Sequence, residues 1–428
     1  MHSTSKTPDL RILLLLSFAL VLCLPASALA SGRGPGYPRL PVGPSSFVHR
    51  PKARLSSSSH HTKTPPKPKL TRAQLIEQEN ATHAVLAFQA MQHYFYIQGS
   101  GLYAGSPQYS FLWPFSQALA TTISLSNAPG QAGRYAAELH ARMVGLQSYF
   151  DTTNSGAEEG TFTSSLPGYD GSVAAPKGPG GAKYYDDNEW VGIELLRVYE
   201  MTGEPTALEE AEQIMAFVMS GWQANPKLGC PGGEPFSNAA NNGTRNTVTT
   251  APGAQLGVLL YRTTGNGEYL HFAEMAYEWV RGCLAQPNLL YADHLGARGV
   301  VEPTLWSYNQ GTMIGAGALL YQATGNGAFL YEARQTANAA LLYFTPSRLA
   351  GENPFFVSVY FRNLIYLDSL TGDAPGSAIA QNYVNYLAAH YLSASGLFST
   401  AAYTPQLLVQ AAIIQIYALL LSPPASYF

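Results

Sequence analysis

The sequence has little cysteine and little charge. Only 3 of its 428 residues are cysteine, and no cluster of His and Cys has the spacing of zinc ligands, so we expect no structural metal and no cofactor. Lys, Arg, Asp and Glu together make up 12% of the chain, which also contains 27 Tyr and 5 Trp. This balance suits sugar binding, in which aromatic rings stack on the sugar and amides bind its hydroxyls.

Apolar runs long enough to cross a membrane are also missing. The run Ile12–Leu24 is short, follows Lys6 and Arg11, and precedes the small residues of Ala28-Leu29-Ala30. This is the layout of a secretory signal peptide. We therefore predict a signal peptide over residues 1–30 and a secreted, extracellular protein without stable membrane insertion. An uncleaved anchor is the alternative.

Acidic residues are absent from residues 31–70, which are rich in Pro, Ser, Lys and Arg. Such a segment cannot bury enough apolar surface to fold, so we predict a disordered basic linker. The alternative is that its eight Lys and Arg hold the protein on an anionic surface. Residues 71–428 hold 14 Lys and Arg against 26 Asp and Glu, which argues against nucleic acid as a partner.

The few cysteines allow at most one disulfide in the exported chain. Cys23 lies in the predicted signal peptide, which leaves Cys230 and Cys283. After export these two residues would meet an oxidising compartment and could form one disulfide. Two free buried thiols are an equal alternative.

An internal repeat is the strongest signal for the fold. In three segments a Tyr precedes the Gly of a Thr-Gly pair by four residues, and a Leu and an Ala follow this Gly after five and eight residues. The glycines are Gly203, Gly265 and Gly325, and Thr371-Gly372 marks a weaker fourth copy. The pattern predicts helix, tight turn, helix, with Gly in the left-handed conformation that ends the first helix.

Twelve helices are predicted from this pattern. They comprise an opening helix over Thr71–Gln98, five helix-turn-helix units, of which the first has its outer helix over Gln131–Phe150, and a closing helix over Thr404–Leu421. The more apolar helices begin near residues 112, 188, 250, 306, 356 and 405 and would form an inner ring. We therefore predict an all-α (α/α)6 toroid of six inner and six outer helices over residues 71–428, and we expect a monomer. An open superhelical array of helix pairs is the alternative.

Long connections lead into the predicted inner helices, and they are rich in Gly, Pro, Asn and aromatic residues. Because all inner helices would run in one direction, these loops and six helix N-termini meet at one end of the ring, which we call the mouth. Long loops on one face of a rigid scaffold usually carry function. We therefore expect the functional site at the mouth.

Two adjacent carboxylates, Asp186 and Asp187, stand at the predicted start of the second inner helix, with aromatic residues on both sides. Asp is also common at helix N-caps and in first turns, so a structural role is the alternative. Glycoside hydrolysis requires two carboxyl groups that flank the scissile bond and differ in pKa. We therefore predict that this pair is catalytic.

Polar and aromatic residues also occur at the other predicted helix starts. Each one alone suits the core or a helix cap, as does Glu302, a second candidate acid beside Pro303. Their shared position at one end of the ring predicts a sugar groove. The candidate substrate-binding residues are Trp113, Tyr184, Tyr185, Asn188, Trp190, Asn246, Trp306, Tyr308, Asn309, Gln310 and Arg362.

Four stretches together resemble glycoside hydrolase family 76, namely YYDDNEWVGIELLRVYEMTG, NTVTTAPGAQLGVLLYRTTG, WSYNQGTMIGAGALLYQATG and FFVSVYFRNL. The resemblance covers most of residues 110–420 and implies an (α/α)6 barrel with endo-α-1,6-mannanase activity that retains configuration. It implies that Asp186 is the nucleophile and Asp187 the general acid/base. It also implies a mannan groove lined by Asn246, Tyr308, Asn309, Gln310 and Arg362. The fifth inner helix lacks the Lys-Gly step associated with bacterial members, so the resemblance does not determine how far the groove extends.

The sequence thus predicts a secreted hydrolase whose partner is a polysaccharide, α-1,6-linked mannan. One rival is a transglycosylase that moves mannosyl-containing chains onto wall glucan, since its chemistry is the same until the acceptor step. The other rival is a mannan-binding protein without activity, against which the intact aspartate pair argues.

Overall fold

The computed structural model describes residues 69–131, 133–153, 163–240, 242–373 and 375–428, which form one compact unit. The predicted signal peptide, 1–30, and the predicted linker, 31–70, lie outside the described residues, apart from Lys69 and Leu70. Within the described ranges, no helix is both long and apolar enough to cross a membrane.

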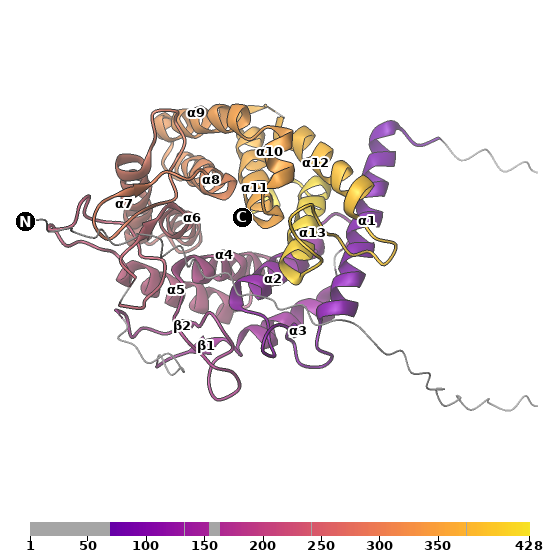
Figure 1. Ribbon diagram of the computed structural model, residues 1–428, viewed down its shortest axis with the longest axis horizontal. Coiled ribbons are helices and arrows are strands. Elements are labelled where there is room, and N and C mark those ends of the chain that lie inside the picture. The colour runs from indigo at the N-terminus through magenta and orange to yellow at the C-terminus, as the bar shows by residue number, and fades with distance from the viewer. Residues whose placement is uncertain (1–68, 132, 154–162, 241, 374) are drawn as a thin grey trace, which may run out of the picture. The chain divides into compact units, whose positions relative to one another are not determined.

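Six helices form the inner ring, and each packs on its two neighbours around the circle. The last inner helix packs on the first, so the ring is closed (Figure 1). The open array is thereby excluded, and the (α/α)6 toroid is confirmed. In order, the inner helices are α2 (Leu112–Ser126), α4 (Tyr185–Thr202), α6 (Thr247–Thr264), α8 (Ser307–Thr324), α11 (Pro354–Thr371) and α13 (Leu407–Leu421).

The inner helices are buried on nearly all sides, because each lies between two inner neighbours and an outer helix. Apolar and small residues therefore occur all around them, as in α13, rather than along one stripe. A Cβ on Gly311 of α8 would lie 2.7 Å from Cα of Tyr360 on α11. Glycine is thus required where the backbones of these two helices lie against each other.

Six outer helices surround the ring, and each packs on one or two inner helices (Figure 1). The opening helix α1 packs on α13, and its N-cap Thr71 forms a capping box with Gln74. A short extra helix, α10 (Pro346–Gly351), lies in the connection to α11. The outer helices are α1 (Arg72–Phe95), α3 (Ala136–Leu146), α5 (Pro205–Ser220), α7 (Gly267–Leu284), α9 (Gly327–Tyr343) and α12 (Pro375–Tyr391).

The Thr-Gly turns end four inner helices as predicted. Gly203, Gly265, Gly325 and Gly372 have φ values of 71°, 75°, 70° and 78°, which is the left-handed region. In the first three turns the Gly N–H donates to the carbonyl of the Tyr four residues earlier, which explains the fixed spacing of the repeat.

The first outer helix is shorter than predicted. It covers Ala136–Leu146 instead of Gln131–Phe150, because Gly130 and Gly133 both take positive φ and hold the chain in turns before it. The connections after it also contain short strands. These are β1 (Phe150–Asp151), which pairs with β2 (Gly168–Tyr169), and an antiparallel sheet of β3 (Arg245–Asn246), β4 (His294–Leu295) and β5 (Val301–Glu302).

Three inner helices fix their incoming loops with an amide side chain at the fourth helical residue. Asn188 of α4 accepts from the N–H of Tyr169 (2.8 Å) and donates to its carbonyl (2.9 Å). Gln310 of α8 forms the same two bonds with Tyr291, at 2.8 and 2.9 Å. Gln410 of α13 accepts from the N–H of Phe398 and donates to the carbonyl of Gly396. These buried amides hold the loops at the mouth in register with the helices.

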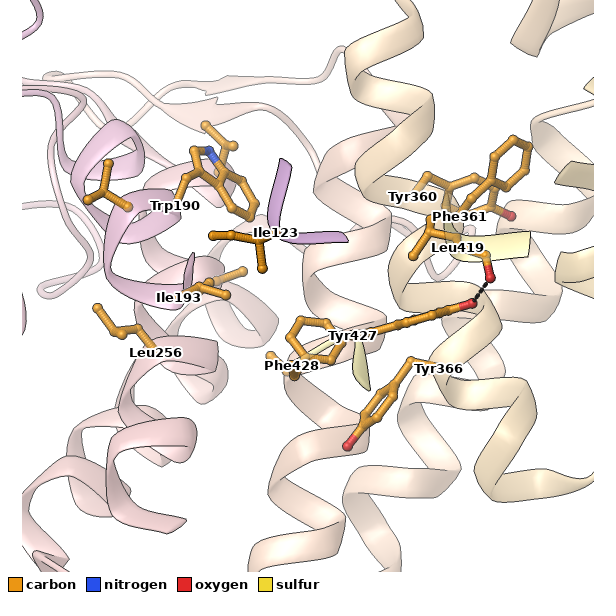
Figure 2. Close-up of a cluster of buried hydrophobic side chains, with 14 of the residues drawn as sticks. Ile123, Trp190, Ile193, Leu256, Tyr360, Phe361, Tyr366, Leu419, Tyr427 and Phe428 are labelled. Carbon is orange, nitrogen blue, oxygen red and sulfur yellow. Dashed lines mark hydrogen bonds between the residues drawn. The ribbon is translucent and has the colours of Figure 1, made fainter. Parts of the chain in front are cut away.

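The end of the ring interior opposite the mouth is filled by the last residues of the chain. Figure 2 shows Tyr427 and Phe428 between the helices that carry Ile193 and Tyr366, with the Tyr427 hydroxyl bonded to the Leu419 carbonyl. Both residues are buried. The ring is therefore a packed core rather than an open channel.

A buried ion cluster lies beside these last residues. Glu194 binds Arg197 (2.6 Å) and Arg362 (2.8 Å) through its two carboxyl oxygens. The two guanidiniums donate in turn to the carbonyls of Ser426 and Tyr427. Burial opposes ionisation, but the two guanidiniums outweigh it and hold the pKa of Glu194 below its ordinary value.

One disulfide joins Cys230, in the loop before β3, to Cys283 near the end of α7. Arg245 is buried beside it and donates to the carbonyls of Gly229, Cys230 and Gly232. The alternative of two free thiols is therefore wrong, and this loop is tied both to its neighbouring helix and to the start of α6.

Candidate active site

Asp186 and Asp187 are the second and third residues of α4, at the mouth of the ring. The N-cap is Tyr184, which makes no side-chain capping bond, so neither aspartate is an N-cap. Asp186 is 6% exposed and Asp187 is 8% exposed. Within the described residues, no lysine or arginine forms an ion pair with either carboxyl. The pair is thus nearly buried without a compensating cation.

These surroundings separate the two carboxyls in acidity. Burial raises the pKa of Asp186 to about 7, although the backbone N–H groups of Asp186 and Asp187 partly oppose this. Burial also raises the pKa of Asp187 well above its ordinary value, and the negative charge of Asp186 raises it further. Asp186 therefore ionises first, while Asp187 keeps its proton.

Two further acids lie behind the pair and were missed in the sequence. Glu189 of α4 and Glu234, from the loop before β3, are both fully buried, and a carboxyl oxygen of each lies 3.0 Å from the point where a Cβ on Gly253 of α6 would lie. Burial, as the largest cause, raises the pKa of both well above the ordinary value. The sequence offered only a weak signal, since Glu189 follows the aspartates but Glu234 lies in a Gly-rich loop.

Aromatic side chains from three inner helices and one loop form one side of the mouth. Phe355 and Phe356 lie in the first turn of α11, and Phe356 stacks on Tyr308 of α8 with ring centroids 3.9 Å apart. Trp113 of α2 contacts Phe355 and Phe356, and Trp306, the N-cap of α8, contacts Phe356. The predicted candidates Trp113, Trp306 and Tyr308 are thus brought together, and the two phenylalanines join them.

Tyr308 connects this aromatic cluster to the acids. Burial raises its pKa well above the ordinary value, and the charges of Asp293, Asp186 and Glu352 add to this effect. Asp293 contacts His294 and Asn309, and Glu352 accepts a hydrogen bond from the N–H of Ser307. Asp293 and Glu352 were not singled out in the sequence, because each is a lone acid within a loop.

Several predicted binding residues have contacts inside the fold. Tyr185 is fully buried and stacks on Phe217 of α5, and Tyr184 packs on Phe236. Asn188 and Gln310 are the buried amides that fix the loops. Trp190 points into the ring interior (Figure 2). These contacts account for Tyr185, Asn188 and Gln310 without a ligand.

The remaining predicted residues divide between the mouth and the interior. Asn246 is the N-cap of α6, and Asn309 lies in the first turn of α8; each has a buried side-chain oxygen without a hydrogen bond among the described residues. Glu302 is exposed on β5 and accepts from Thr304. Arg362 lies eight residues into α11, where it binds Glu194 and the end of the chain. Its contacts thus place it in the interior cluster rather than at the mouth.

Five cavities of about 270 to 460 Å³ lie against the outer helices α1, α3, α9 and α12, away from the aspartates. Across the described part of the chain, no group of three His, Cys, Asp or Glu is arranged to hold a metal ion.

The closed ring of helix pairs carries two adjacent, uncompensated carboxyls at its mouth, and a pair of carboxyls is what ring-shaped glycoside hydrolases use for catalysis. The family model described as Glycosyl hydrolase family 76 matches residues 79–363, which is more than half of the chain. The chain belongs to this family.

Curated relatives match part of the chain. A mannan endo-1,6-alpha-mannosidase, DCW1 of Saccharomyces cerevisiae, is 26% identical over 174 residues, which are 37% of this chain and 38% of the relative. The protein of the same name from Candida glabrata is 28% identical over 111 residues, 24% of this chain and 25% of its own. The matches thus span less than half the length of these relatives.

Solved structures share the fold over most of the chain. A family 76 mannosidase from Bacteroides thetaiotaomicron superposes with a TM-score of 0.70 at 19% identity, covering 79% of this chain and 97% of its own. An inactive variant of an α-1,6-mannanase from Salegentibacter sp. HEL1_6, with two consecutive aspartates replaced by asparagine, was solved in complex with α-1,6-mannotriose. It has a TM-score of 0.65 at 18% identity and covers 80% of this chain and 98% of its own.

Proposed function

We propose that this protein is a secreted endo-acting hydrolase that cleaves α-1,6-mannosidic bonds with retention of configuration. Asp186 is the nucleophile and Asp187 is the general acid and base. The observation that carries this assignment is the position of two adjacent, nearly buried carboxyls without a compensating cation at the mouth. The named activity of the curated relatives and the ligand of the Salegentibacter structure support mannan as the substrate.

The two steps follow from these protonation states. In the first step ionised Asp186 attacks the anomeric carbon, while Asp187 gives its proton to the leaving glycosidic oxygen. The pKa of Asp187 falls once the ester of Asp186 has no charge, because the repulsion between the two carboxyls is gone. Asp187 can then take a proton from water, which attacks the ester and releases the sugar with Asp186 restored.

The aromatic residues of the mouth provide the sugar-binding surface. Trp113, Trp306 and Tyr308 are partly exposed and lie together, so they offer ring faces on which mannose units stack. Asn246 and Asn309 each direct an oxygen that lacks a hydrogen bond within the described residues, and a sugar hydroxyl would satisfy it. We propose these five side chains as the groove.

The test is the release of mannose oligomers from α-1,6-mannan by the secreted chain, with the anomeric configuration of the first product followed by NMR. Asp186→Asn and Asp187→Asn should each lower kcat by at least about 10³-fold, because each removes a group that acts in the transition state. Asp368→Asn is the control, since Asp368 lies near the other end of an inner helix and binds the Gly376 N–H. Full activity of either mouth variant, or inversion of configuration, contradicts the proposal.

The same assay decides between hydrolysis and transfer. With added oligosaccharide acceptor, a hydrolase continues to release free mannose oligomers, whereas a transglycosylase forms a longer product. Binding of mannan without any product would instead support a protein that only binds the polysaccharide.

A further inference from the structure

Two fully buried glutamates face each other directly behind the catalytic pair, and the mechanism above does not use them. Glu189 lies on α4 three residues after Asp186, so the two side chains share one face of the helix. Glu189 and Glu234 each place a carboxyl oxygen 3.0 Å from the point where a Cβ on Gly253 of α6 would lie. The absence of a side chain at Gly253 thus makes room for both carboxyls.

The surroundings of these two carboxyls contain no compensating charge. Glu189 faces Asp186 on α4 and the backbone N–H of Gly253 on α6, and Glu234 faces Tyr185 on α4. Within the described residues, no Lys, Arg or His forms an ion pair with either glutamate. Their four carboxyl oxygens are buried and have no hydrogen-bond partner among the described residues.

A hydrogen bond between the two facing carboxyls would satisfy these oxygens, and it needs a proton that one of the carboxyls carries. Two ionised carboxylates offer no donor and repel each other, whereas a carboxylic acid donates its O–H to its neighbour. Burial in a site without a cation favours this protonated form. The pair consequently keeps at least one proton under conditions in which an exposed glutamate has lost it.

The main chain of Glu234 is fixed to the start of α6. Its N–H donates to the hydroxyl of Thr250 (3.1 Å), and its carbonyl accepts from the N–H of Asn246 (3.2 Å) and the hydroxyl of Thr249 (2.9 Å). Its carboxyl is therefore a fixed partner for Glu189, and through Glu189 for the first turns of α4.

We propose that Glu189 and Glu234 form a proton-dependent clamp that joins α4 to the start of α6 and thereby positions Asp186 and Asp187. Both glutamates are positioning residues, since neither is exposed at the mouth. When the last shared proton is lost at alkaline pH, repulsion replaces the hydrogen bond and the catalytic turn separates from α6. The effect on catalysis rests on the proposed function, but the effect on stability does not.

Two substitutions of one residue test the clamp. Glu189→Gln supplies a permanent N–H donor to the Glu234 carboxyl, so the link no longer depends on pH, whereas Glu189→Ala removes it. Glu200→Gln is the matched control, because Glu200 is an exposed residue near the far end of the same helix. Thermal unfolding of the full chain is measured from about pH 5 to about pH 9, and kcat and KM on α-1,6-mannan over the same range.

The sign of the pH effect follows from the raised pKa values of the pair. Stability from the shared proton is complete below the ordinary glutamate pKa and is lost as pH rises through the raised values. We expect the alkaline fall in melting temperature of Glu189→Gln to be smaller than that of the wild type and of Glu200→Gln by roughly 2–4 °C or more. In the same variant, the decrease of kcat at alkaline pH should begin at a higher pH than in the wild type.

Glu189→Ala should lower kcat by about 10²-fold with little change in KM, because a displaced catalytic turn impairs the reaction more than binding. The clamp is overturned if the melting temperature of Glu189→Gln falls at alkaline pH as much as that of the wild type. It is also overturned if Glu189→Ala keeps the kcat of the wild type. If Glu189→Ala does not fold, the comparison of Glu189→Gln with the wild type decides alone. A wild type that folds but does not cleave mannan overturns the proposed function and leaves the unfolding test valid.

Discussion

The mouth and the opposite end of the ring interior place buried acids in contrasting surroundings. Glu189 and Glu194 are five residues apart on α4, and both are buried. Glu194 lies between two arginines, which outweigh burial and hold its pKa below the ordinary value. Glu189 faces another glutamate, and burial and that neighbour raise its pKa well above the ordinary value. A single helix thus carries a protonated acid near its start and an ionised one near its middle.

This difference shows that one ring contains buried acids that stabilise the fold and buried acids that are suited to catalysis. A buried carboxyl with cationic partners stays ionised and binds the surrounding elements together, as Glu194 does for two inner helices and the last residues of the chain. A buried carboxyl without a cation destabilises the fold unless it binds a proton. Such groups hold protons near neutral pH, which is what general acid catalysis requires.

Among the substitutions, we expect the largest loss of stability from one that removes Glu194 from the interior ion cluster. Glu194→Ala leaves Arg197 and Arg362 buried without a carboxylate, so it should lower the free energy of unfolding by about 3–5 kcal/mol. Chemical denaturation at neutral pH measures this loss. Glu189→Gln is the comparison on the same helix, and it should leave stability unchanged or raise it, because it removes an acid that faces another acid. An equal loss of unfolding free energy in Glu194→Ala and Glu189→Gln would contradict the view that only Glu194 stabilises the fold as an ionised acid.

The pH dependence of unfolding of the wild type compares the acids of the mouth with Glu194 in the interior. Burial raises the pKa of Asp186 and of Glu352 to about 7, so the folded state binds protons that the unfolded chain releases near pH 4. Between these values each of the two groups should lower stability by roughly 3 kcal/mol as pH rises. Glu194 has a lowered pKa, so its contribution is lost in the other direction, as pH falls through that pKa.

Denaturant unfolding from about pH 3 to about pH 8 measures both slopes. Asp186→Asn should flatten the decrease between pH 4 and pH 7 and leave the acidic side unchanged. A stability that rises steadily up to pH 8 would show that the acids of the mouth are ionised in the folded protein.

The smallest predicted effect concerns the amides that fix the loops. Gln310→Ala removes the partner of the Tyr291 N–H and carbonyl, so it should cost about 1–3 kcal/mol. Hydrogen exchange at the Tyr291 amide should accelerate, because this loop leads into the mouth. Gln89→Ala, at an exposed glutamine of α1, is the control and should change stability by less than about 0.5 kcal/mol. Unchanged exchange in Gln310→Ala would show that other contacts hold the loop.

Much of the fold could be predicted because its signals are local. A Tyr, a Gly four residues later and an apolar helix after it are enough to place a turn, and Gly203, Gly265 and Gly325 take the predicted conformation. The starts of the inner helices lie within three residues of the predicted ones. Only the first outer helix was clearly too long, because two glycines delay its start.

The candidate site could be predicted only in part. The place of Asp186 and Asp187 at the mouth follows from the helix start, which the sequence indicates. The direction of a side chain does not follow from it: Asn188 and Gln310, two of the predicted binding residues, form hydrogen bonds with loop backbone. Asp293 and Glu352 were overlooked, since single acids in loops carry no pattern.

By itself, the sequence determined the closed ring, the mouth and the two aspartates at the start of α4, because helix periodicity and glycine turns act over a few residues. Only the tertiary structure decided which buried acids have a cation. Glu194 meets Arg362 across the ring, and Glu189 meets Glu234 from a distant loop. The acidity of a carboxyl depends on burial and on charges within a few ångströms, and the packing of segments far apart in the chain fixes both.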